Sequence, residues 1–414
     1  MKHVKLFLFV LSMTILIGCS ASQSNDYKEN STTNIIDSQS GIQGKPLVEL
    51  SDIDMKEFHA STEDGMYFLQ DRDSDKAAQI MYLDYNLNIC IPLCNRPNCS
   101  HDDESCTSYL AGAAYTSICF VLNNKLYVMH LINNLDDGAM APGSIDEIDL
   151  NGENRHEILR LSDNQYFMQT GILGNENSLI FNVQETDGTT KGAETKFVTY
   201  RFDFSSGKLF RLYEEEFPTF ILGALNDSIL LKRIEMNPDA INDPSLYEQQ
   251  NHTICKIDQN GEIVNNELIS WKQGSLSTVY KNGVFYQLNS DTGEICATKF
   301  LDLSNYVIMQ SDILVGSFNS ISACWDGGLI LSVEPEEETM ERVYYLCKDN
   351  NIVESPYPYL GGTSTTKNKI VAQTDQDFLV QRSFGQNPSY AFVKKDYCWN
   401  GGGNEKDIAF KNVY

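Results

Sequence analysis

A short stretch rich in cysteine, at residues 90–114, carries the clearest chemistry in the sequence. Four residues of metal-binding types fall there within thirteen positions, in the spacing C-x4-C-x-H-x4-C: Cys94, Cys99, His101 and Cys106. Structural zinc takes four tetrahedral ligands of these types, and closely spaced pairs let one loop surround the ion. A Pro97-Asn98 turn would fold the chain back between the first two ligands. The spacing therefore predicts a structural zinc that orders a loop too polar to fold alone.

The same cysteines allow other interpretations. The spacing is not one of the common zinc-finger spacings, and an exported protein can form disulfides instead. Cys90 fits disulfide pairing, or could replace His101 as a ligand. Unligated thiols are the third alternative. Six further cysteines occur singly in or beside strand patterns and are expected to be buried small hydrophobes: Cys119, Cys255, Cys296, Cys324, Cys347 and Cys398.

The first residues predict where the protein resides. Residues 1–18 begin with Lys2 and Lys5, continue with an apolar stretch, and end in Leu16-Ile17-Gly18 directly before Cys19. This is the pattern of a secretory signal peptide whose cleavage site ends in a cysteine. The alternative is an uncleaved transmembrane helix, but an apolar core of about twelve residues is short for a bilayer. We expect an extracytoplasmic protein.

The run that ends in Cys19 resembles the lipobox of bacterial lipoproteins. The resemblance implies that Cys19 becomes the mature N-terminus and carries fatty acid, such as palmitate, on its sulfur. The lipid bilayer of the cell membrane is then one partner. Residues 19–45 are rich in Ser, Asn, Thr, Gly and Gln, and cannot bury enough apolar surface to fold. They are predicted to form a flexible tether.

Composition and charge exclude one class of partner. Hydrophobic residues make up 42% and charged residues 21% of the chain, which is ordinary for a globular protein. The net charge is −26, and without residues 1–18 it becomes −28, from 29 basic and 57 acidic residues. Such a surface repels nucleic acid, so no nucleic-acid partner is expected.

From about residue 60 onward, short apolar runs alternate with tight turns, without a long helical period. Seven two-residue turn signals each precede an apolar strand: Asp64-Gly65, Asn123-Asn124, Glu176-Asn177, Asn226-Asp227, Asn282-Gly283, Asp326-Gly327 and Gln376-Asp377. Asn and Gly suit these turns because tight hairpins need positive φ. In each of the first five units an Asp then precedes a polar turn: Asp84, Asp149, Asp203, Asp258 and Asp302. In the sixth unit Cys347 takes the place of this Asp.

This unit recurs about every 44 to 60 residues. A repeat of that length with about four strands is typical of a propeller. We predict an all-β, seven-bladed β-propeller over residues 46–414, with independent sandwiches as the alternative. An early strand near residues 46–50 is expected to complete the last blade, because joining the first and last strands removes an open edge.

Propeller topology also predicts a functional face. The tight turns lie on one side, and the long insertions lie on the other: 133–144, 185–196, 237–253, 334–341 and the cysteine-rich stretch. Long loops on a rigid scaffold often carry function. Tyr357 and Tyr359 lie in an aromatic loop that could stack on a sugar or a peptide, or form an ordinary strand-end turn.

The sequence contains none of the common catalytic signatures, such as GxSxG or HExxH. Five histidines besides His101 are isolated and expected at the surface or in turns: His3, His59, His130, His156 and His252. We expect a cell-surface binding or scaffold module for a protein, peptide or glycan, rather than an enzyme. The alternative is a propeller-type glycan hydrolase or lyase, which would need a pair of carboxylates.

Several of these residues together are similar to a known group. Leu93-Cys94, Pro97-Asn98-Cys99 and the stretch from His101 to Cys106 follow a lipobox and precede propeller repeats. In this they resemble uncharacterised β-propeller lipoproteins of Gram-positive anaerobes that have a Cys/His-rich insertion. Asp396-Tyr397 and Trp399-Asn400-Gly401 are similar to that group as well. The resemblance implies a shared fold and no activity. Cys90 and Cys398 are additions to the group's pattern, so the cysteine pairing stays open.

Overall fold

The described part of the chain consists mostly of β-strands. The computed structural model describes residues 35–37, 46–51, 59–72, 76–113, 116–131, 133–134, 140–168, 170–186, 195–235, 237, 246, 249–274, 276–316, 319–325, 327–333, 343–354, 369–381, 390–400 and 405–408. All of them belong to one unit, residues 33–414. Helix is limited in these residues to α1 (Lys395–Trp399) and short 3-10 turns. The predicted all-β class is confirmed.

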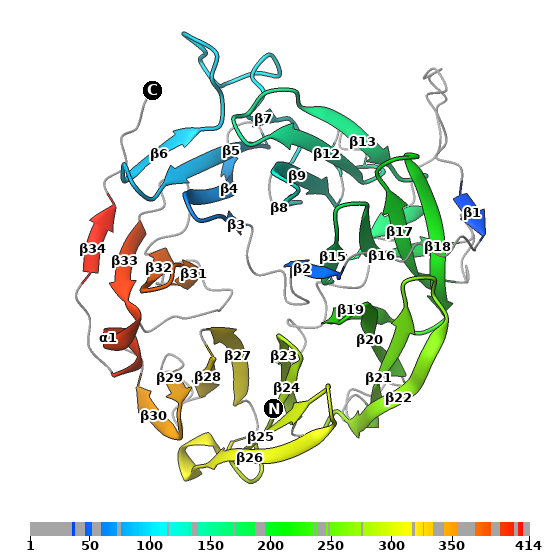
Figure 1. The fold of residues 1–414 in the computed structure, drawn as a ribbon, viewed down its shortest axis with the longest axis vertical. Coiled ribbons are helices and arrows are strands. Elements are labelled where there is room, and N and C mark those ends of the chain that lie inside the picture. Colours follow the sequence, from blue (N-terminus) through cyan, green and yellow to red (C-terminus); the bar gives the residue numbers. More distant parts are fainter. Residues whose placement is uncertain are drawn as a thin grey trace, which may run out of the picture. The chain divides into compact units, whose positions relative to one another are not determined.

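Seven sheets surround a common centre, which confirms the seven-bladed propeller (Figure 1). The first strand of each blade lies innermost and the fourth outermost. Blades 1 to 3 contain β3 (His59–Ser61), β4 (Gly65–Arg72), β5 (Ala77–Asp84) and β6 (Ile89–Pro92); β8 (Ser117–Leu122), β9 (Lys125–His130), β12 (Ser144–Asp149) and β13 (His156–Arg160); and β15 (Ile172–Gly174), β16 (Ser178–Thr186), β17 (Thr195–Asp203) and β18 (Lys208–Glu215).

Blades 4 to 7 repeat the same order. They contain β19 (Thr219–Leu225), β20 (Ser228–Glu235), β21 (Asn251–Asp258) and β22 (Ile263–Lys272); β23 (Leu276–Lys281), β24 (Val284–Asn289), β25 (Glu294–Lys299) and β26 (Ser304–Gln310); β27 (Ser320–Trp325), β28 (Gly328–Val333), β29 (Val343–Lys348) and β30 (Asn351–Glu354); and β31 (Lys369–Gln373), β32 (Asp377–Gln381), β33 (Tyr390–Lys394) and β34 (Glu405–Ile408). Every neighbouring pair within a blade is antiparallel, so short turns suffice to join them.

The turn residues behave as the sequence predicts. Asn123 and Asn124 between β8 and β9 both have positive φ (53° and 58°), as a tight hairpin requires. In blades 1, 3 and 4 the Asp that ends the third strand accepts backbone N–H groups of the following turn. Asp84 Oδ1 accepts the backbone N–H of Asn86 at 2.9 Å, and Asp258 Oδ1 accepts that of Asn260 at 2.8 Å. The repeated Asp therefore serves turn formation, because an Asp carboxylate readily accepts backbone N–H groups of the residues that follow it.

The prediction that a strand at residues 46–50 completes the last blade is wrong. β2 (Val48–Ser51) pairs with β15, at the inner edge of blade 3, and the buried Leu47 packs among Leu173 and Ile221. Blade 7 obtains its outer strand from β34 near the C-terminus. Apolar packing joins blade 7 to blade 1, with the rings of Phe68 and Tyr390 5.5 Å apart. Alternating residues identify a strand, but they do not identify the free edge that it pairs with.

Short additional strands extend the blades. β1 (Ile35–Asp37), inside the segment expected to be a tether, pairs in parallel with β18 at the outer edge of blade 3. β14 (Gln165–Phe167) pairs with β16, and β7 (Tyr109–Leu110) pairs with β5. β10 (Asn133–Asn134) and β11 (Met140–Ala141) form a ribbon in the first predicted long insertion.

Several predicted features lie outside the described residues. They are the signal peptide, Cys19, most of the tether, Tyr357 and Tyr359, and residues 187–194, 238–245 and 334–342 of the predicted long loops. Within the described residues, no helix is both long enough and apolar enough to span a bilayer.

Candidate metal centre

The Cys/His stretch is an insertion in the outer strand of blade 1. β6 ends at Pro92, and β7 pairs again with the same neighbour, β5, at Ala78 and Gln79. Residues 93–108 leave the sheet between these two pieces. The sequence placed this stretch among the connections of the long-loop face. The structure places it at the outer rim of the ring, beside blade 2 (Figure 1).

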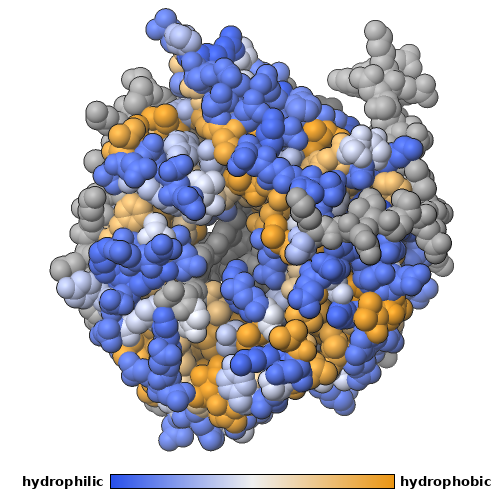
Figure 2. Space-filling view, viewed as in Figure 1, coloured by the Kyte–Doolittle hydropathy of each residue, from blue (hydrophilic) through white to orange (hydrophobic). Residues whose placement is uncertain are grey.

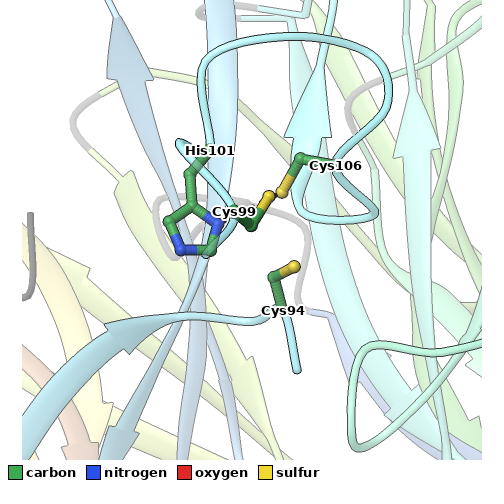
Figure 3. A group of neighbouring side chains, drawn as sticks. All are labelled: Cys94, Cys99, His101 and Cys106. Carbon is green, nitrogen blue, oxygen red and sulfur yellow. Dashed lines mark hydrogen bonds between the residues drawn. The ribbon is translucent and has the colours of Figure 1, made fainter. Parts of the chain in front are cut away.

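The insertion brings all four predicted ligands together. The sulfur atoms of Cys94, Cys99 and Cys106 and a ring nitrogen of His101 lie within 4.8 Å of one another (Figure 3). His101 Nδ1 is 3.3 Å from Cys106 Sγ. A tetrahedral zinc with bonds of about 2.3 Å to sulfur holds neighbouring sulfurs about 3.8 Å apart. The four donor atoms thus lie within about one ångström of the separations that a single tetrahedral ion requires.

Two tight turns bring the ligands together. Asn98 and His101 both have positive φ (56° and 58°), a conformation that Asn and His adopt more readily than most residues. The Cys99 N–H donates to the Arg96 carbonyl at 3.3 Å, which confirms the turn predicted at Pro97-Asn98. The Cys106 N–H donates to the Asp103 carbonyl at 3.0 Å, and this second turn returns the chain to the cluster.

The cluster is closed on the protein side and reaches the surface on the other. Cys106 is 1% exposed and packs against Ala77 of β5 and Tyr109 of β7, while the other three ligands are half-buried. Ser108 Oγ lies 3.0 Å from Cys106 Sγ, and the buried Gln79 side chain donates to Ser108 Oγ. The sheet itself therefore supplies the floor of the centre.

Two arginines support the loop around the cluster. Arg72, at the end of β4, donates to the His101 carbonyl at 3.1 Å, and its guanidinium lies 5.4 Å from the ring centroid of Tyr109. Arg96 donates to the Ser105 carbonyl. Spacing alone did not reveal Arg72 as part of the centre, because it lies on another strand. Its position at a strand end facing the insertion became visible only in the fold.

The thiols in the cluster do not share one pKa. Partial burial acts to raise the pKa of Cys94, but hydrogen bonds from the Arg96 backbone and from Cys106 and Cys99 bring it below its usual value. For Cys99, the backbone hydrogen bond from His101 acts to lower the pKa, yet desolvation and the Cys106 and Cys94 groups raise it overall.

Cys90 is not part of the cluster. It lies on β6 and is buried among Leu83, Leu379 and Tyr390 at the boundary with blade 7. Burial raises the pKa of its thiol to about 12. Neither predicted role of Cys90, as a disulfide partner for the cluster or as a replacement for His101, fits this position. The described cysteines form no disulfide in this structure.

The remaining single cysteines are mostly buried, as predicted. Cys119, Cys255, Cys347 and Cys398 are buried, and Cys296 and Cys324 are half-buried. Most of these side chains pack in apolar clusters between blades; Cys119, for example, lies among the buried residues shared by blades 1 and 2.

The insertion also binds blade 2. Arg155 Nη1 donates to the carbonyls of Thr107 and Tyr109 at 3.0 and 2.5 Å, and Asn95 Nδ2 donates to Glu153 Oε1 at 2.6 Å. Gly152 has φ +83°, and a Cβ there would lie 2.3 Å from the Leu93 carbonyl oxygen. The insertion therefore contacts the outer parts of two blades, blade 1 and blade 2.

Behind Arg155, a row of buried polar groups crosses blade 2. Arg155 Nε lies 3.4 Å from Asp146 Oδ2, which lies 3.6 Å from His130 Nε2, and His130 Nδ1 lies 2.9 Å from Ser117 Oγ. These are the residue types of a hydrolase triad. Ser117 is 2% exposed on an inner strand, so a substrate cannot approach its hydroxyl. The row holds the sheet and Arg155 in place.

The expectation that His130 and His252 lie at the surface or in turns is wrong. His130 is 6% exposed and His252 only 3%. Neither ring nitrogen of His252 has a hydrogen-bond partner, and its ring lies 5.2 Å from that of Trp271. Desolvation, with a smaller effect of Lys232, lowers the pKa of His252 to about 3. A single histidine in a polar sequence context gave no signal of this burial.

Among known proteins, only solved structures are similar to this chain. No family model matches the chain, and no curated protein matches it. An acylaminoacyl peptidase from Pyrococcus horikoshii has a TM-score of 0.48 at 11% identity, over 87% of this chain and 52% of that chain. An oligogalacturonate lyase in complex with manganese has a TM-score of 0.48 at 9% identity, over 85% of this chain and 92% of that chain.

A post-proline cleaving enzyme from Rickettsia typhi has a TM-score of 0.45 at 12% identity, over 87% of this chain and 54% of that chain. The chain thus spans about half the length of the peptidases that it resembles. No activity follows from likenesses at this level of identity.

Gly152 tests the contact between the insertion and blade 2. Gly152→Ala should lower the free energy of unfolding by about 1 kcal/mol from left-handed strain, and by at least about 1 kcal/mol more because the Leu93 carbonyl must move. Gly207→Ala is the matched control, since Gly207 has φ +63° and nothing within 4 Å of an added Cβ. Chemical denaturation measures the stability of both variants, and limited proteolysis measures how well the insertion is held in each. Equal losses in the two variants would contradict the contact.

His252 makes a defined contribution to acid sensitivity. Its pKa is lower in the folded state than in the unfolded state, so the folded protein loses stability as the pH falls from about 6.5 towards 3. Between pH 7.5 and 5 this loss should be about 2 kcal/mol. His252→Leu should remove it, whereas the exposed His156→Leu should keep the wild-type dependence. Denaturant titrations at several pH values measure the free energy of unfolding of each protein. An identical pH dependence for wild type and His252→Leu would contradict the proposed contribution of His252.

Proposed function

We propose that this protein is a lipid-anchored, extracytoplasmic β-propeller that acts as a binding scaffold, and that a structural zinc orders its rim insertion. The observation that carries the proposal is the convergence of Cys94, Cys99, His101 and Cys106 within 4.8 Å. These residues come from a loop that departs from the sheet and returns to the same strand. A metal ion explains why four such side chains point at one another.

Zinc accounts for this donor set better than a disulfide does. The cluster contains three thiols and one imidazole, so a disulfide would use two thiols and leave the other two groups without a role. Zinc uses all four, and four protein ligands complete its tetrahedral shell. A site without a vacant position is structural. Zinc with three thiolates carries a net charge of −1, and the guanidiniums of Arg72 and Arg96 in the same loop region offset it.

The ordered insertion gives the scaffold a rigid projection. Its residues are mostly polar, and zinc binding supplies folding free energy that such a loop lacks, about 10–16 kcal/mol in small zinc domains. The hydrogen bonds of Arg155 and Asn95 fix the projection against blade 2. A preorganised surface binds a partner at a smaller entropic cost than a mobile one. The partner classes that suit it are a protein, a peptide or a glycan.

The proposed location rests on the sequence. The basic start, the apolar stretch and Leu16-Ile17-Gly18-Cys19 support export followed by lipidation of Cys19. Acyl chains on this cysteine would hold the propeller at the cell surface, because each buried methylene contributes about 0.8 kcal/mol. A chain with net charge −28 after removal of residues 1–18 does not bind an anionic membrane through its surface, so the lipid would carry the attachment.

Metal analysis tests the zinc centre. Protein purified under reducing conditions should contain one zinc per chain, and Cys99→Ser and His101→Gln should lower zinc retention at least tenfold because each removes one of four ligands. Cys296→Ser, a half-buried cysteine on β25, should keep the metal. Chelation should raise the count of reactive thiols by three. Metal-free wild-type protein with oxidised cluster cysteines would show disulfides instead.

Lipid labelling tests the anchor. Cells that express the full chain and receive an alkyne analogue of palmitate should label it, and Cys19→Ala should lose the label and pass into the soluble fraction. Cys296→Ala should remain labelled and membrane-bound. Membrane retention of an unlabelled Cys19→Ala protein would instead indicate an uncleaved transmembrane segment.

A further inference from the structure

The outer edge of blade 5 exposes an unusual amount of apolar surface. Six large hydrophobic side chains in the fifteen residues around β26 are exposed, and we call them the rim patch: Leu301, Leu303, Tyr306, Val307, Ile313 and Val315. They make up six of the thirteen exposed large hydrophobics in the described part of the chain. In Figure 2, hydrophobic surface reaches the lower rim, where Figure 1 shows β25 and β26. Exposed apolar groups gathered in this way mark interaction surfaces.

β26 is also a sheet edge without the usual protection. Among the described strands it pairs only with β25, so on that description its other side offers backbone N–H and C=O groups to a further strand. Natural edge strands carry charges or proline, or are covered. Among the outer strands that the structure describes, β13, β22, β30 and β34 contain charged residues, β18 is covered by β1, and β6 has Pro92 and the insertion. β26, with the sequence SNYVIMQ, has none of these.

The same ring shows that an outer edge accepts a strand. β1 adds to β18 in parallel, with Ile35 opposite Leu209 and Asp37 opposite Arg211. That added strand belongs to this chain and uses the edge of blade 3. The edge of blade 5 has equivalent geometry, since β26 and β18 are both fourth strands of their blades.

The charges around β26 are predominantly acidic. Asp302 precedes the strand, and Asp312 follows it. Asp291 and Glu294 lie near its far end, where Glu294 is opposite Gln310. A basic side chain is also present: the Lys299 ammonium lies 5.5 Å from the ring centroid of Tyr306. A strand that binds here would therefore gain from positive charge.

We propose that β26 pairs with an extended peptide segment of a partner protein in which apolar and basic residues alternate. The peptide backbone would complete the hydrogen bonds of the β26 edge. Its apolar side chains would lie on one face of the sheet beside Val307, and its basic side chains would interact with the surrounding carboxylates. This names a partner class for the scaffold proposed above and rests on that role, but it requires neither the zinc nor the lipid.

A second copy of the chain suits the edge less well. Antiparallel pairing of β26 with itself would bring Asp302 of one copy towards Asp312 and Glu294 of the other. Like charges in such positions repel, and the whole chain carries a net charge of −26. A basic peptide reverses the sign of that interaction.

The probe is a fluorescein-labelled heptapeptide that alternates lysine and valine, and the readout is its anisotropy with purified propeller at 50 and 200 mM salt. Val307→Lys places a charge on the edge and should weaken binding at least tenfold. Val264→Lys on β22 is the matched control. Val264 and Val307 are 55% and 57% exposed, and Glu262 and Glu267 lie close to Val264 in the sequence. Binding to Val264→Lys should stay within twofold of wild type.

A second peptide separates strand pairing from charge attraction. The same heptapeptide with N-methyl groups on every interior backbone nitrogen keeps its charge but offers no interior N–H on either edge, and it should bind at least tenfold more weakly. Wild-type circular dichroism and an unchanged denaturation midpoint of Val307→Lys show that the fold is intact. Equal weakening by both lysine variants, equal binding of both peptides, or no binding to wild type would overturn the proposal. So would a wild-type dimer that Val307→Lys dissociates, which would make a second copy the occupant.

Discussion

Apolar packing between neighbouring sheets is the interaction on which the rest of this protein depends. Successive residues of a strand point to opposite faces, so every blade presents two faces to its neighbours. On β4, Met66 and Phe68 pack towards blade 7, whereas Tyr67 between them packs towards blade 2. Burial on both faces explains why the middle strands are nearly continuous apolar runs. It also explains how the ring closes between blades 1 and 7 without a strand shared by the two.

Because the faces are buried, the outer edges of the blades are where this chain differs from blade to blade. An edge strand exposes backbone groups and must be covered, charged or paired. Blade 3 pairs its edge with β1, and blade 1 interrupts its edge with the Cys/His-rich insertion. β26 leaves its edge open beside apolar and acidic side chains. Both sites discussed here therefore result from the same constraint on sheet edges.

The metal centre illustrates how a rigid sheet can position a polar loop. β6 and β7 pair with the same strand, so the sheet holds both ends of the insertion before any metal binds. Cys106 lies on this floor, and the turns at Asn98 and His101 direct the other donors towards it. Arg155 then connects the loop to Asp146 and His130 inside blade 2. The loop thus depends on the packing of two blades as well as on its ligands.

The sequence was sufficient to predict features that depend on residues close together along the chain. Asn and Gly in the hairpins, an Asp before the polar turn of the first five units, and the repeat length together predicted seven blades, because turn geometry depends on only a few neighbouring residues. The ligands Cys94, Cys99, His101 and Cys106 were predicted for the same reason, since all lie on one short segment.

Tertiary structure alone decided which distant segments meet. It placed β2 on blade 3 instead of the last blade, Cys90 at the boundary with blade 7, and the insertion at the rim. It also brought Arg72 to the metal centre and buried His130 and His252. Strand alternation specifies which side of a residue faces a core, but it carries no information about the partner edge. Burial likewise depends on which side chains of neighbouring strands pack against a residue, as Trp271 packs against His252, and this packing forms only in the folded sheet.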